Sequence, residues 1–273
     1  MASRSAWEGW ARDLARGFAG AILFALPLLM TMEMWWIGFY VSPGRLALFL
    51  VLSVPLLVAL AYYAGFRDSF DWRDDVVDAF TAIAIGAVTA TAALSLFGVI
   101  RLGDGLLDIV GKIAVQTVPA SMGAVLAREQ LGGDEADAQE RQEEAGYPAK
   151  VFLMAAGALY FSFNVAPTEE MLLIAFRMSS WHGLALVAVS LGVLHVFVYE
   201  VGFYGGRRPE LDRFWPLFVR YSVVGYGVAL VVSAYALWTF GRFAGLDLER
   251  SVLAVVVLGF PAAIGAAAAR VVL

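Results

Sequence analysis

Two carboxylates lie within long apolar stretches of this 273-residue chain, each two residues after a threonine. Glu33 follows Thr31, and Glu170 follows Thr168 at an offset of 137 residues. An ionised side chain inside a bilayer costs roughly 3 kcal/mol or more, so a membrane glutamate is a functional candidate by default. Carboxylate and hydroxyl oxygens bind hard cations, and burial favours a protonated carboxyl group. The duplicated Thr-x-Glu motif could therefore bind a metal cation or a proton.

Further oxygen atoms and helix-breaking prolines accompany the motif. Pro27 lies six residues before Glu33, and Pro167 lies three residues before Glu170. Each proline removes one helical hydrogen bond and frees a backbone carbonyl oxygen. Asn164 stands four residues before Thr168, so the two should share a helical face. The predicted ion-binding set is Glu33, Glu170, Thr31, Thr168, Glu169 and Asn164, with Glu33 and Glu170 as metal ligands, and Ser162, Gln116 and Thr117 could add oxygens.

The glutamates also allow a purely structural interpretation. Glu33 lies towards the far end of its apolar stretch, which would place it near the outer interface of the membrane. There, Glu33 and Glu170 could pair with Arg45 or Arg177 and serve only the assembly of the helices. Both interpretations remain open at this point.

The composition restricts the class of protein. Hydrophobic residues make up 61% of the chain and charged residues 16%, with a mean hydropathy of +0.75, whereas soluble domains are about 25% charged. The chain has no cysteine and two histidines, which excludes thiol chemistry and leaves little for a histidine-rich metal site. The net charge of -5 and the scattered arginines favour neither nucleic acid nor a polybasic lipid anchor. We expect an all-helical membrane protein without a cofactor.

Apolar segments of about 20 residues can cross the hydrocarbon core, and in lipid such segments should be helical. Eight can be drawn, at 17–41, 45–66, 79–100, 107–128, 150–174, 182–204, 217–241 and 251–272. Arginine is concentrated in alternate connections, on the side that holds both termini. The positive-inside rule then predicts that both termini are cytoplasmic. The first segment has no cleavage signal and is expected to be retained.

An internal repeat organises these segments. At the offset of 137 the first two segments match the fifth and sixth at polar and small residues as well as apolar ones, including Gly20 with Gly157 and Tyr62 with Tyr199. Four segments in each half predict two parallel four-helix repeats, related by a pseudo-twofold axis along the membrane normal. The predicted domains are 1–133 and 150–273, joined by an acidic cytoplasmic linker at 134–149.

Two further prolines fall at matching places in the fourth and eighth segments. Pro119 and Pro261 each open a run of small residues that ends in arginine, and we include them with Pro27 and Pro167 as predicted helix breaks. The small neighbours Gly123 and Gly265 predict close helix packing at these kinks.

Lys112 and His195 are polar residues of apolar segments that the motif does not include. Lys112 could extend towards the outer surface or pair with Asp108. His195 could titrate near neutral pH, but a single histidine on an apolar helix more often makes a structural hydrogen bond.

The motifs Thr-Met-Glu-Met-Trp-Trp at 31–36 and Ala-Pro-Thr-Glu-Glu-Met at 166–171, within this architecture, resemble a bacterial family of integral membrane proteins of unknown function. The resemblance covers most of the chain and implies a multi-pass protein of the bacterial inner membrane. It implies no activity.

Glu169-Glu170 followed by Arg177 also resembles the Glu-Glu-x-x-x-Arg motif of intramembrane CAAX-type proteases. The spacing differs, because six residues separate Glu170 from Arg177. His182 and His195 follow without the histidine motifs of that family, and one hydrolytic site leaves the duplication unexplained. We therefore do not expect an enzyme and predict no catalytic residue.

These observations predict a cation channel or secondary transporter whose partners are the lipid bilayer and a small inorganic cation. The alternative is a non-transporting scaffold or sensor that recruits a partner through the acidic loop at 129–150. Homo-oligomerisation remains open.

Overall fold

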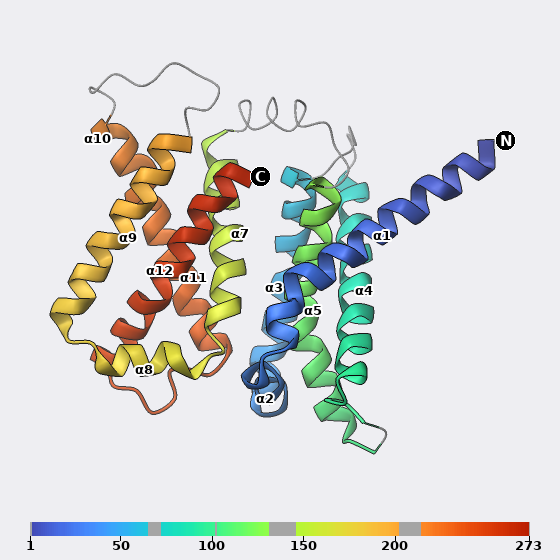
Figure 1. The fold of residues 1–273 in the computed structure, drawn as a ribbon, viewed down its shortest axis with the longest axis horizontal. Helices are drawn as coiled ribbons and strands as arrows, with labels where there is room; N and C mark the ends of the chain where they lie inside the picture. The colour runs from blue at the N-terminus through green and yellow to red at the C-terminus, as the bar shows by residue number, and fades with distance from the viewer. Residues whose placement is uncertain (1, 65–71, 102, 131–145, 202–213, 273) are drawn as a thin grey trace. The chain divides into compact units, whose positions relative to one another are not determined.

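The structure, a computed structural model, describes residues 2–64, 72–101, 103–130, 146–201 and 214–272, and all of its regular elements in these ranges are helices (Figure 1). The chain divides into two compact units, Met1–Arg141 and Gln142–Leu273. Most of the predicted acidic linker at 134–149 lies outside the described residues. The exact domain limits of 133 and 150 therefore stay a prediction.

Five helices form unit 1: α1 (Ala2–Leu29), α2 (Met32–Tyr40), α3 (Pro43–Ala64), α4 (Trp72–Leu96) and α5 (Leu106–Gln130). Helix α5 lies at the centre and packs against the other four (Figure 1). Its residues 114–127 are almost all buried, because small side chains alternate with medium-sized ones and let the neighbouring helices approach closely.

Unit 2 contains α7 (Tyr147–Val165), α8 (Glu169–Arg177), α9 (Ser180–Val201), α10 (Phe214–Leu217), the π-helix η2 (Phe218–Val223), α11 (Val224–Thr239) and α12 (Leu248–Val272). Helix α12 holds the central place, in contact with α7, α8, α9 and α11 (Figure 1). Its alanine-rich second half is buried in a core with Met154, Leu194 and Tyr226. The last predicted segment of each half is therefore the hub of its unit.

Seven described helices are long and apolar enough to cross a membrane, and an eighth span results if the bent pair α1 and α2 is taken as one. Many large apolar side chains on them are exposed, such as Leu107 at 87% and Val231 at 71%, as expected of helix faces covered by lipid. The prediction of eight apolar segments is confirmed to this extent.

Two of the predicted segments were wrong as single helices. The segment 17–41 turns by 85° between α1 and α2, and the segment 150–174 is interrupted between Val165 and Glu169. Hydropathy did not reveal either break, because apolar residues continue on both sides of each one.

The predicted close packing at Gly123 and Gly265 is present. A Cβ atom on Gly20 of α1 would collide with the backbone of Gly123 in α5, and one on Gly157 of α7 would collide with the backbone of Gly265 in α12. Helix α1 thus crosses α5 in unit 1 as α7 crosses α12 in unit 2, with backbones in direct contact. The prolines nearby do not interrupt the helices: α5 continues on both sides of Pro119, and α12 on both sides of Pro261.

Candidate functional site

The first Thr-x-Glu motif lies at the break between α1 and α2. Helix α1 ends at Leu29, Thr31 caps the start of α2 in an extended conformation (φ -97°, ψ 116°), and Glu33 lies in the first turn of α2. Glu33 is half-buried. Acidic side chains are common in the first turn of a helix, where backbone N–H groups and the positive end of the helix dipole lie. The glutamate therefore starts a helix, whereas the sequence had predicted it inside one.

Side chains donate to carbonyl groups at the end of α1, where the backbone N–H of Thr31 also donates to Leu28 at 3.2 Å. The Thr31 hydroxyl donates to the carbonyl oxygen of Pro27. The amide Nε2 of Gln116 donates to Leu28 at 3.0 Å, and the indole Nε1 of Trp35 donates to Leu29 at 2.8 Å. In an apolar medium an unpaired carbonyl would cost several kcal/mol, so these three donors stabilise the break. Pro27 itself lies inside α1, two residues before the helix ends.

The second motif lies at the break between α7 and α8. Helix α7 ends at Val165, and Thr168 caps α8 in an extended conformation (φ -72°, ψ 145°) while its hydroxyl donates to the Val165 carbonyl at 2.9 Å. Pro167 is buried in the break itself. Glu169 and Glu170 form the first turn of α8, and both are exposed on unit 2.

Because the helix is interrupted here, the prediction that Asn164 and Thr168 share one helical face was wrong. The two residues stand at the end of α7 and at the cap of α8, so they do not share a face of one continuous helix. The amide Nδ2 of Asn164 donates back to the carbonyl of Tyr160 at 2.8 Å.

The two motifs produce the same local structure. Helices α2 and α8 have nine residues each, and both the first and the last residue of α8 come 137 positions after those of α2. The threonine of each motif occupies the N-cap position without a side-chain capping hydrogen bond, and the glutamate lies in the first turn.

Arg250 anchors the far end of α8. Its Nη1 donates to the carbonyl oxygens of Ala175 at 3.1 Å, Phe176 at 3.0 Å and Met178 at 3.1 Å. A guanidinium group at a helix C-terminus satisfies open carbonyls and complements the negative end of the dipole. Neither this arginine nor Trp35 is recognisable in the sequence as a capping residue, because nothing in the local pattern distinguishes a capping side chain from an ordinary interfacial one.

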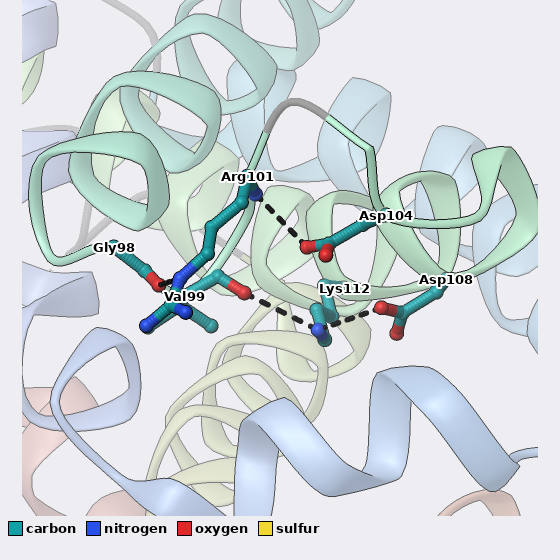
Figure 2. A network of polar contacts seen from close by, with 6 residues as sticks. All are labelled: Gly98, Val99, Arg101, Asp104, Asp108 and Lys112. Atoms are coloured by element: carbon teal, nitrogen blue, oxygen red, sulfur yellow. Dashed lines mark hydrogen bonds and ion pairs between the residues drawn. The ribbon is translucent and has the colours of Figure 1, made fainter.

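A polar network at the connection from α4 to α5 contains the predicted pair of Lys112 with Asp108, which is confirmed (Figure 2). The Nζ atom of Lys112 lies 2.8 Å from an Asp108 carboxylate oxygen and donates to the Val99 carbonyl at 3.2 Å. Arg101 donates its backbone N–H to Asp104 at 2.9 Å and its Nε to Gly98 at 3.1 Å (Figure 2).

The network also lies beside α2. A Cβ atom on Gly38 would come within 2.7 Å of the backbone nitrogen of Lys112, so α2 packs directly on this turn of α5.

His195 makes a structural hydrogen bond, as its isolated position had suggested. Its Nδ1 lies 3.0 Å from the hydroxyl of Ser222 in η2, and the side chain is buried.

The candidate metal ligands come from different units, Glu33 from unit 1 and Glu170 from unit 2. Their predicted meeting across a shared path stays a prediction. Within the part of the chain that the structure describes, no three side chains of His, Cys, Asp or Glu cluster as a metal site.

The apolar helices, their lipid-facing side chains and the capped breaks define a multi-pass helical integral membrane protein. Residues 13–273 match the family described as "Putative integral membrane protein (DUF2391)". The match spans nearly the whole chain, so the protein belongs to this family, which confirms the resemblance noted from the motifs. No curated protein and no solved structure matches the chain.

Proposed function

We propose that this protein is a cation channel or secondary transporter of the bacterial inner membrane, and that the two helix breaks bind the transported ion. The observation that carries the proposal is the repeated arrangement of a broken helix, a threonine at the N-cap position and a glutamate in the first turn of the next helix. Membrane transporters commonly build their ion sites at such discontinuous helices, where irregular backbone lines the binding site.

The chemistry of each break suits a cation. The glutamate offers carboxylate oxygens at the start of the short helix, and the C-terminus of the preceding helix adds partial negative charge. Thr31 and Thr168 each donate their hydroxyl proton to a backbone carbonyl, which leaves their oxygen lone pairs as acceptors. A carboxylate and acceptor oxygens together attract a cation and repel an anion.

We propose further that the two units are parallel repeats related by a pseudo-twofold axis along the membrane normal, with both termini cytoplasmic. Support comes from the helix bounds: α9 begins and ends 137 residues after α3, and α12 begins and ends 142 residues after α5. The glycine contacts of α1 with α5 and of α7 with α12 involve matching residues. Such an axis would let Glu33 and Glu170 face one path.

The proposal includes no catalytic step. A hydrolase would need His195 to act with Glu169 and Glu170 on one water molecule. The hydrogen bond of His195 to Ser222 and the position of the glutamates at the start of α8 favour separate structural and ion-binding roles.

The test is ion flux into proteoliposomes, measured for protons, sodium, potassium and calcium. We expect flux of one cation in the wild-type protein and its loss in a folded Glu33→Gln/Glu170→Gln variant. Glu249→Gln is a matched control, because Glu249 also lies in a first helical turn and is exposed like Glu170, but follows no break within a span.

Equal flux in wild type and double variant, or none in either, would refute the proposal and return both glutamates to a structural role. The scaffold alternative would then be tested by deleting the acidic run of the 129–150 loop.

A further inference from the structure

The break in unit 1 contains a buried acceptor that the proposed function does not yet use. Gln116 of α5 is completely buried, and its Nε2 donates to the Leu28 carbonyl at 3.0 Å. Because a carbonyl can only accept, the amide nitrogen must face Leu28 and the oxygen Oε1 must point elsewhere. Among the described residues, Oε1 has no hydrogen-bond donor. A buried acceptor without a donor or cation is energetically costly.

Unit 2 also has a buried amide oxygen at its break, but the residue that carries it occupies a different position of the repeat. Asn164 donates its Nδ2 to the carbonyl of Tyr160 near the end of α7, and its Oδ1 is buried with no donor among the described residues. In the alignment of the two repeats, Asn164 corresponds to Pro27 at the offset of 137. Gln116 corresponds to Leu258 at the offset of 142. Each break thus has one primary amide whose nitrogen is bound to a carbonyl of the first helix and whose oxygen is open, although the repeat does not align the two.

We infer that Gln116 supplies to the break of unit 1 the amide oxygen that Asn164 supplies to the break of unit 2, and that the break of unit 1 binds an alkali cation, sodium or potassium. This inference rests on the proposed function and narrows it. An amide oxygen coordinates a metal cation but is not protonated near neutral pH, so it favours a metal ion over a proton.

The charge at this break selects the class of cation. Thr31 and Gln116 contribute neutral oxygens, and Glu33 in the adjoining turn is the one acidic residue of the motif in this unit. A divalent ion would leave an uncompensated positive charge in an apolar surrounding, which is costly, whereas a monovalent ion is neutralised.

The experiment is hydrogen exchange measured by mass spectrometry on the purified full chain. Peptides covering residues 26–34 report on the break of unit 1, and peptides from α9, which contains no part of either break, are the internal reference. Sodium chloride or potassium chloride replaces choline chloride at constant ionic strength, so that general salt effects cancel. Cation binding should slow exchange at 26–34, because a ligand that binds the closed form suppresses local opening.

Two variants of Gln116 should act in opposite directions. Gln116→Leu, which introduces the residue found at the matching position of unit 2, should raise the half-saturating cation concentration about tenfold or more, and Gln116→Glu should lower it about tenfold. Both variants lose the donor to Leu28, so a purely structural role would shift exchange in the same direction in both. Thr89→Val is the control, because it removes a buried hydroxyl without a donor from α4, away from the break.

The inference is overturned if exchange at 26–34 in the wild-type protein responds equally to choline and alkali chlorides, since Oε1 would then accept from water alone. An unchanged half-saturating concentration in either Gln116 variant that folds would also overturn it. Cation-dependent protection without flux would refute the proposed function and leave this site standing. Flux that depends on Glu33 and Glu170 but not on Gln116 would support the proposed function and refute the role of Gln116 in binding the cation.

Discussion

The indole Nε1 of Trp35 donates to the carbonyl oxygen of Leu29 at 2.8 Å, across the break between α1 and α2. One side chain of the short helix thus returns to the end of the long helix that precedes it. The next residue, Trp36, is 59% exposed on the same helix. The two adjacent tryptophans therefore have different roles, one in holding the turn and one at the lipid-facing surface.

Trp35→Phe should weaken this turn. The substitution keeps an aromatic ring but removes the donor, so the Leu29 carbonyl loses a partner in an apolar environment. We expect the free energy of unfolding, measured by denaturant titration in detergent micelles, to fall by about 1–3 kcal/mol. Trp36→Phe should change it by less than about 0.5 kcal/mol. Equal effects of the two substitutions would show that the hydrogen bond does not hold the break.

Gly157→Ala should destabilise unit 2 by overpacking. The new methyl group would collide with the Gly265 carbonyl and the Ala269 side chain, and helix backbones cannot easily move apart. We expect a loss of about 1–3 kcal/mol. Gly192→Ala in α9 meets nothing within 4 Å, so it should be neutral or raise stability by up to about 1 kcal/mol through helix propensity. Thermal unfolding of both variants in one detergent provides the comparison.

The ion pair of Lys112 with Asp108 should contribute to stability. The side chains are only 15% and 19% exposed, so a single substitution leaves a poorly solvated charge. In a double-mutant cycle with Lys112→Met and Asp108→Asn, we expect a coupling energy of about 1–3 kcal/mol, with the double variant more stable than the sum of the single losses predicts. A coupling energy near zero would mean that the hydrogen bond of Lys112 to Val99 alone determines its position.

Arg250→Gln should release the end of α8. The variant loses the group that satisfies three carbonyl oxygens, and hydrogen exchange of the 175–180 segment should accelerate at least about tenfold. Arg177→Gln is the matched control, because Arg177 also lies at the end of α8 but its side chain is exposed. If the 175–180 segment exchanges at the same rate in both variants, positive charge near the end of α8 stabilises it and the three hydrogen bonds of Arg250 do not.

Some of the candidate site could be predicted from the sequence. Pro27 and Pro167 indicated a disturbed helix near each Thr-x-Glu motif, since a proline removes a helical hydrogen bond. The prolines did not show that each segment divides into two helices. The glycines that permit close helix contact were recognisable too, because only small side chains fit such crossings. The pair of Lys112 with Asp108 followed from their spacing of four residues on one helix.

The composition and the apolar segments alone determined that this is a multi-pass helical membrane protein, because a bilayer leaves few other ways to satisfy the backbone of such stretches. Tertiary structure alone decided where α1 ends and that α2 turns by 85°. The apolar pattern continues through that turn, and one of its donors, Gln116, lies 88 residues from the carbonyl it binds. No local pattern records a partner that distant, so the position of Glu33 in a first helical turn became visible only in the folded chain.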